Sequence, residues 1–344
     1  MSTYIPLNAR LHGWQAPKLL ACVLLVLGAC SSSEEPSPAY EPVHRPPGWL
    51  LNTWGTSQTN LFVVGGTPEA GRVDHYDGAG WSSVPLPVDT PLLAWMWGWP
   101  GDTVFVVGAR GTVLRGQGQG AAMTWTKEPV PTTQDLWGVW GTNEADVWAV
   151  GGNGLAEGDA TLLHRTPSGW QSVPVPPLQR ALVRAFYKVW GTSASDVWVV
   201  GQSGAVLHFD GITWTERLVG TGEDLISLWG VGERLVVVGG RTVGVVATFD
   251  GQTWNTRSLP AVPGLNGIWM RDAEHVHVAG TNGFTARIDF KSLAVAPHAP
   301  ITALDLHAVF GTPDGALVAV GGNLLSTRGP FEGVALQRAL TETE

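Results

Sequence analysis

One pattern of aromatic residues, glycine and leucine recurs seven times and constrains the fold more than any other feature. Each copy is anchored by an aromatic residue, at spacings of 43, 43, 50, 39, 40 and 41 residues: Trp54, Trp97, Trp140, Trp190, Trp229, Trp269 and Phe310. A leucine or phenylalanine precedes every anchor by four residues, and in six copies glycine follows it directly. Self-similarity at this period indicates a repeat architecture in which each copy is one structural unit.

The copy WGTSASDVWVVGQSGAVLHFDGITW, residues 190–214, shows how one unit folds. Alternating apolar residues predict strands at 186–190, 197–200, 205–209 and 213–217, with small polar residues and an Asp-Gly hairpin turn between them. We name these strands A to D. Seven such units without a helical pattern predict an all-β fold, a seven-bladed β-propeller of four-stranded antiparallel blades, over residues 48–344.

The columns of the repeat predict how the blades pack and close. Large apolar anchors are expected to fill the space between neighbouring blades, and the glycine after each anchor avoids a clash near the crowded axis. Residues 49–54 are expected to form strand A of the first blade. Residues 331–337 are expected to supply the last strand of the seventh blade.

The first 29 residues have the features of an export signal. Arg10 and Lys18 are the only charges before Cys30, and the apolar run from Leu19 to Leu27 is too short to span a bilayer. The run ends in Leu27-Gly28-Ala29-Cys30. Residues 31–47 are rich in serine, proline and glutamate, so residues 30–47 are expected to form a flexible tether.

The N-terminus resembles bacterial lipoproteins, whose signal ends in a lipobox of this type. The resemblance implies cleavage before Cys30, lipidation (palmitate among the acyl chains) of that cysteine, and attachment to a membrane. Ser31 in place of aspartate implies the outer membrane, with the periplasmic and the cell-surface face both open. Cys22 leaves with the signal, so no disulfide is expected in the mature chain.

The repeats themselves resemble two propeller families. The first copy, from Gly65-Gly66 through Tyr76 to Trp81, is similar to a kelch repeat. The Asp-Gly-x-x-Trp endings, such as Asp210 to Trp214, are similar to an Asp-box. Residues 50 to about 337 are most similar to WGT…DVWVVG…HFDG…W propellers on secreted lipoproteins, a resemblance that implies a fold and no uniform activity.

Most eye-catching polar residues have a structural explanation. The histidines of one strand-C column lie in different blades and cannot share an ion, and His275 and His277 have no third ligand nearby, so no metal site is expected. Aspartates that recur at the C–D hairpin suit tight turns. No nucleophile elbow, zinc-protease motif or P-loop is present, so we nominate no catalytic residue and no cofactor.

Geometry nominates a binding face instead. In propellers the D–A connections and B–C turns share one end of the ring, which we call the B–C face, and ligands usually bind there. The B–C turns place seven residues at equivalent positions: Thr67, Arg110, Asn153, Ser203, Arg241, Asn282 and Asn323. Arg180 and Arg184, in the longest connection between blades, are nominated as a partner contact.

Charge and pattern together favour a non-catalytic binding or scaffold module. The formal charge is −9, so no nucleic-acid partner is expected. Expected partners are the membrane, through the N-terminal lipid, and an unidentified protein or glycan bound by a monomer. Two alternatives stay open: a glycan-active hydrolase or lyase with carboxylates in the central channel, and an assembly factor for an envelope complex.

Overall fold

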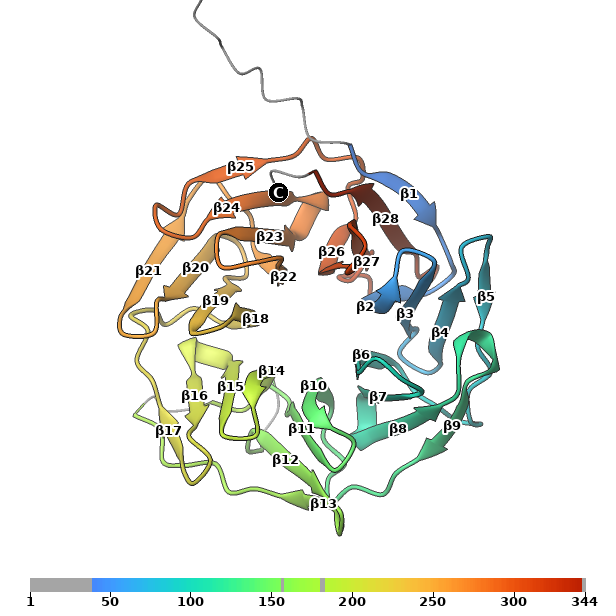
Figure 1. The fold of residues 1–344 in the computed structure, drawn as a ribbon, viewed down its shortest axis with the longest axis horizontal. Helices are drawn as coiled ribbons and strands as arrows, with labels where there is room; N and C mark the ends of the chain where they lie inside the picture. Colours follow the sequence, from blue (N-terminus) through green and yellow to red (C-terminus); the bar gives the residue numbers. More distant parts are fainter. Residues whose placement is uncertain (1–38, 156–157, 180–182, 342–344) are drawn as a thin grey trace, which may run out of the picture. The chain divides into compact units, whose positions relative to one another are not determined.

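The computed structural model describes residues 39–155, 158–179 and 183–341 and confirms the seven-bladed β-propeller (Figure 1). Each blade is a four-stranded antiparallel sheet, with its A strand at the centre of the ring. The first three blades are β2 (Trp49–Ser57), β3 (Asn60–Gly66), β4 (Gly71–Tyr76) and β5 (Trp81–Ser83); β6 (Leu93–Gly98), β7 (Thr103–Gly108), β8 (Thr112–Gln117) and β9 (Thr124–Lys127); and β10 (Leu136–Asn143), β11 (Asp146–Gly151), β12 (Thr161–Thr166) and β13 (Gly169–Ser172).

The next three blades repeat this order. They are β14 (Phe186–Ser193), β15 (Asp196–Gly201), β16 (Val206–Phe209) and β17 (Trp214–Glu216); β18 (Leu225–Val231), β19 (Arg234–Gly239), β20 (Gly244–Phe249) and β21 (Trp254–Leu259); and β22 (Leu265–Met270), β23 (His275–Gly280), β24 (Thr285–Asp289) and β25 (Val295–Pro297). Short 3₁₀ turns occur at η1 (Ala109–Gly111), η2 (Gly120–Ala122), η3 (Gln202–Gly204) and η4 (Thr281–Gly283). The four strands predicted for the fourth copy are thus confirmed, with ends shifted by a few residues.

The seventh blade closes the ring with a strand from the other end of the chain. It contains β26 (Asp305–Gly311), β27 (Ala316–Gly322), β28 (Gly333–Ala339) and, outermost, β1 (Glu41–His44), which pairs antiparallel with β28. The prediction that residues 331–337 supply the last strand is therefore wrong, because they lie largely in the third strand. The expected propeller start at residue 48 is also wrong, since β1 belongs to the ring.

Contacts around β1 fix this closure. His44 lies 2.7 Å from a carboxylate oxygen of the buried Asp74 in the first blade, and its ring stacks on Trp81 at 4.6 Å. Burial raises the pKa of Asp74, but hydrogen bonds from His44 and Arg72 outweigh it and lower that pKa. The stretch read as the end of a tether thus bridges the first and last blades.

The repeat columns pack as predicted. Each A strand contacts the A strands of the neighbouring blades, and the buried leucines and valines lie between the sheets. A Cβ on Gly191 would lie 2.8 Å from the Trp140 ring, and one on Gly311 would lie 2.3 Å from the Trp269 ring. At these two positions the indole of the preceding blade therefore leaves no room for a side chain.

The recurring aspartates shape turns, as expected. Asp210 accepts backbone hydrogen bonds from Ile212 and Thr213, at 2.9 and 2.7 Å, and Asp250 does the same in the next blade. These backbone donors lower the pKa of both carboxyl groups.

Several expectations concern residues outside the described ranges. They are the signal at 1–29, the lipidated Cys30, the first part of the tether and Arg180. Within the described ranges, no helix has the length and apolar character needed to cross a membrane.

Candidate functional site

The anchors converge on the axis of the ring and form an aromatic layer. The ring centroid of Trp97 lies 6.4 Å from that of Trp140 and 6.1 Å from that of Trp229, three blades away. Trp229 in turn lies 6.4 Å from Phe310 in the seventh blade. Rings from distant blades touch only where they meet near the axis, so we call this level the aromatic layer.

The next level toward the B–C face lies two residues before each anchor. At this level the residue type changes from blade to blade. Its seven positions carry polar, charged, aromatic and very small residues: Asn52, Trp95, Gly138, Lys188, Ser227, Gly267 and Ala308. A Cβ on Gly138 would lie 3.0 Å from the Lys188 Cα. Glycine in the third blade therefore allows the backbone of β14 in the fourth blade to approach closely.

The side chain of Lys188 reaches from the fourth blade to the second. Its Nζ lies 2.7 Å from the centroid of the Trp95 ring, which belongs to the second blade, and 3% of the residue is exposed. Within the described part of the chain, the ammonium makes no hydrogen bond and no ion pair. Burial lowers the pKa of Lys188 well below its ordinary value. A buried cation without a carboxylate costs stability, which is why such groups are usually paired or serve a function.

A second titratable side chain reaches the same region from the seventh blade. His307, on β26, donates from Nδ1 to the Leu51 carbonyl of the first blade at 2.6 Å. Burial lowers the pKa of His307 to about 4, and the positive charges of Lys188 and Arg241 contribute. The three groups therefore lie within electrostatic reach of one another, although they come from blades four, five and seven.

Arg241 lies on the B–C turn of the fifth blade, at the B–C face. Its Nη2 donates to the Tyr187 hydroxyl at 3.0 Å, and its Nε donates to Asp224 at 2.9 Å. The guanidinium also lies 5.3 Å from the Tyr187 ring centroid, yet 61% of the side chain stays exposed. Burial and the nearby Asp224 carboxylate raise the pKa of the Tyr187 phenol. Arg241, Tyr187, Lys188 and His307 form what we call the axial cluster.

The other nominated B–C residues lie on the expected turns. Three of them link neighbouring blades through backbone hydrogen bonds. Arg110, Ser203 and Asn282 adopt left-handed φ angles of 56–57°. Each backbone N–H donates to an aspartate at the start of strand A of the next blade or directly before it, at 2.9 Å: Asp135, Asp224 and Asp305. These bonds explain the positions as links between blades.

The remaining positions are engaged in turns or at the seam. Thr67 and Asn153 each accept a backbone hydrogen bond within their own turn. The Asn323 amide accepts from Trp49 Nε1 at 3.0 Å and donates to the Pro330 carbonyl, and thereby helps to close the ring. The structure thus gathers Arg241, rather than the whole predicted set, into the axial cluster.

Other sequence candidates have local partners. The backbone N–H of Arg184, the described member of the proposed partner contact, donates to Gln202 at 3.0 Å. His164 and His208 each bond an aspartate of their own blade, at 2.7 and 2.8 Å. His275 bonds Asp272. Across residues 39–155, 158–179 and 183–341, no group of three or more potential ligands could hold a metal ion.

Comparison with known proteins supports the fold. No family model matches the chain, and no curated protein matches it. Among solved structures, YCF48 bound to a D1 peptide has a TM-score of 0.63 at 14% identity, covering 89% of this chain and 100% of its own. YCF48 from Cyanidioschyzon merolae has 0.64 at 13%, covering 88% and 99%. The Cps50 (Swd1) propeller domain from Myceliophteria thermophila has 0.63 at 13%, covering 88% and 100%. At this identity the likeness shows the propeller fold alone.

The sequence reading missed Lys188, Trp95 and His307. The signal that marks them is the column two or three residues before the anchor, whose members do not resemble one another. Each blade has this position, but the residue type there varies. Packing between blades therefore does not constrain it, as it constrains the anchor column.

Proposed function

We propose that this propeller is a binding module that docks an acidic segment of a protein partner on its B–C face. The observation that supports this most strongly is the axial cluster: a buried Lys188 with no ion pair among the described residues, and the exposed guanidinium of Arg241, whose charges both act on His307. A carboxylate placed between them would form charge-assisted hydrogen bonds with both. The cluster is thus a local cationic site on an otherwise acidic chain.

Exposed apolar side chains on connections at the same end of the ring favour a protein partner. Val88, Leu155 and Leu325 lie on D–A or B–C connections and are 90%, 99% and 86% exposed. Exposed apolar residues beside fixed charges are typical of protein interfaces. The solved YCF48 structure, with its bound D1 peptide, is a precedent for peptide binding by this fold. The same face would serve a scaffold or an assembly factor.

A glycan-active enzyme finds less support. That hypothesis needs two carboxylates facing each other in the central channel. The side chains that meet at the axis are instead Lys188, Trp95 and His307.

Binding of an oligoglutamate peptide to the mature protein tests the proposal by fluorescence anisotropy. We expect Arg241→Ala to weaken binding by about tenfold, because it removes one charge-assisted contact. Arg271→Ala is the matched control, since this exposed arginine lies beyond the A strand at the opposite end of its blade. Equal losses in both variants would show nonspecific attraction and contradict the proposal.

We further propose that the module is held at the outer membrane by a lipid on Cys30. The support is the lipobox-like stretch that precedes this residue. Several acyl chains would anchor the protein stably, whereas one chain binds only marginally. Cys30→Ala is expected to abolish lipidation and to release the protein from the membrane fraction. An unchanged N-terminal mass and unchanged fractionation would contradict the anchor.

A further inference from the structure

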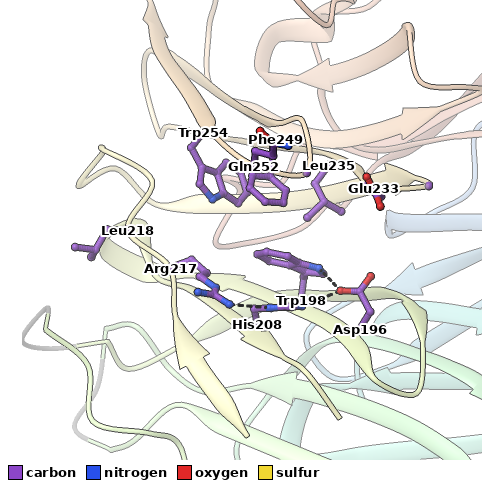
Figure 2. Close-up of a pocket in the computed structure, with 12 residues that line it drawn as sticks. Asp196, Trp198, His208, Arg217, Leu218, Glu233, Leu235, Phe249, Gln252 and Trp254 are labelled. Atoms are coloured by element: carbon purple, nitrogen blue, oxygen red, sulfur yellow. Dashed lines mark hydrogen bonds and ion pairs between the residues drawn. The ribbon is translucent and has the colours of Figure 1, made fainter. Parts of the chain in front are cut away.

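A groove opens between blades four and five, away from the axial cluster. Its volume is about 630 Å³, within the range of roughly 300–1,000 Å³ typical of small-molecule sites. Figure 2 shows Trp198 and Phe249 facing each other across it, with Trp254 above and Glu233 at the rim. Glu233 and Gln252 lie on the A–B and C–D turns of blade five, at the end of the ring opposite the B–C face.

The floor of the groove is a structural unit of the repeat. Asp196 Oδ1 accepts from Trp198 Nε1 at 2.9 Å and from His208 Nε2 at 2.8 Å, while Thr192 donates to Oδ2. The His208 ring stacks on Trp198 at 4.0 Å. Burial raises the pKa of Asp196, but these hydrogen bonds outweigh it and lower that pKa. The carboxylate is therefore satisfied within its own blade.

The interface between blades three and four contains the same set of aspartate, tryptophan and histidine but packs differently. His164 stacks on Trp148 at 3.9 Å and bonds Asp146, as in blade four. There Trp214 of the next blade lies edge-on against Trp148 at 5.1 Å. The corresponding Trp254 lies 6.0 Å from Trp198. The tryptophans at the interface between blades three and four are therefore closer together than those between blades four and five, where the groove lies.

Three rim positions change character between these two interfaces. Counting from the tryptophan of strand D, Arg217 replaces Val173 and Gln252 replaces Ile212; counting back from the glycine that ends strand B, Glu233 replaces Ser195. Ser195 and Glu233 both lie over the glycine of their C–D turn, which confirms the equivalence. Since the neighbouring interface forms without these polar groups, the propeller does not need them for folding.

The rim offers hydrogen bonds in both directions around an aromatic surface. Arg217 Nη2 donates to His208 Nδ1 at 3.2 Å, which leaves its other N–H groups available to a ligand. Glu233 and Gln252 are exposed, and within the described chain no hydrogen bond or ion pair forms at their side-chain ends. At the rim the charges of Arg217 and Glu233 balance, and the Asp196 carboxylate of the floor already accepts hydrogen bonds from its own blade, so the groove favours a neutral ligand.

We propose that this groove binds a neutral saccharide. The C–H face of a sugar ring would pack on Trp254 and Phe249, which stack at 5.0 Å. Its hydroxyls both donate and accept, so they would satisfy Glu233, Gln252 and Arg217 together. An aliphatic peptide side chain would instead desolvate two charges without replacing their hydrogen bonds. This site is independent of the proposed function of the axial cluster.

Titration of the intact mature protein with neutral trisaccharides of glucose, galactose and N-acetylglucosamine tests this inference. Saturation-transfer NMR and tryptophan fluorescence report contact with the indoles. We expect saturable binding of at least one trisaccharide below about 10 mM. The triple variant Arg217→Val, Glu233→Ser, Gln252→Ile copies the rim of the neighbouring interface and should weaken binding by about tenfold or more.

Two controls make the result decisive. The triple variant should keep the wild-type melting temperature, because the same residues already occupy equivalent positions one blade earlier. Arg241→Ala should leave saccharide binding unchanged, which separates this groove from the axial cluster. The inference is overturned if no neutral trisaccharide binds, if the triple variant binds as well as the wild type, or if only acidic sugars or peptides bind.

Discussion

The two levels of the ring axis are built from adjacent positions of the same strands, yet they differ in chemistry. In the aromatic layer, six blades contribute tryptophan and one contributes phenylalanine, and the rings pack on one another. At the level of Lys188, two residues before each anchor, the seven blades contribute six different residue types. The first level repeats because every blade must pack on its neighbour.

This difference teaches where to look for function in a repeat protein. Repeated residues meet a demand that all blades share, so their variation is limited by packing. The position of Lys188 meets no such demand, because glycine, alanine or serine suffices in other blades. A buried cation retained where a small residue would fit is an unfavourable choice for stability. The comparison therefore predicts opposite responses to substitution at the two levels.

The largest effect is expected in the aromatic layer. Trp140→Ala removes an indole that is 4% exposed and packs on Gly191 of the next blade. The cavity and lost burial should lower the free energy of unfolding by about 3–5 kcal/mol. Chemical denaturation measures this loss. Trp125→Ala, at a half-buried outer strand, is the control, and an equal loss there would contradict a special role for the axis.

The repeated features of the fold could be predicted from the sequence, and the singular ones could not. The seven blades and the glycine after each anchor follow from columns that recur. Strand β1 has no such column: its four residues, EPVH, carry no apolar alternation, and their partner β28 lies almost 300 residues away. The axial cluster joins three blades through side chains of unlike chemistry, so periodicity alone cannot reveal it.

A smaller effect is expected from His307, and it depends on pH. In the unfolded chain this histidine has a pKa of about 6.5, whereas burial and the Lys188 charge lower its pKa to about 4 in the fold. Between these values the unfolded state binds more protons, so stability falls as pH falls. The loss should be on the order of 2–3 kcal/mol from about pH 6.5 to pH 4.

The variant His307→Asn isolates this contribution. Asparagine keeps a donor for the Leu51 carbonyl but does not titrate. Denaturation between pH 6.5 and 4 should therefore change less in the variant than in the wild type. Carboxylates such as Asp196, whose pKa is lowered, lose their contribution from about pH 5 downward, but they do so equally in both proteins, so the difference between variant and wild type removes them. If the NMR signal of His307 in the folded wild type titrates near pH 6.5, its pKa is not lowered and the prediction is wrong.

The smallest expected change in stability, and the most informative, comes from Lys188→Met. Methionine has a similar shape and can pack against Trp95 without carrying a buried charge. The free energy of unfolding should rise by on the order of 1 kcal/mol, because a desolvated cation is removed. The pKa of His307 should rise, since Lys188 helps to lower it.

Oligoglutamate binding to the Lys188→Met variant should weaken by about tenfold, because the buried end of the carboxylate site is lost. A residue that only packs would lose stability when replaced and leave binding unchanged. If Lys188→Met destabilises the protein with unaltered peptide affinity, the contact with Trp95 is structural and the axis holds no functional cation.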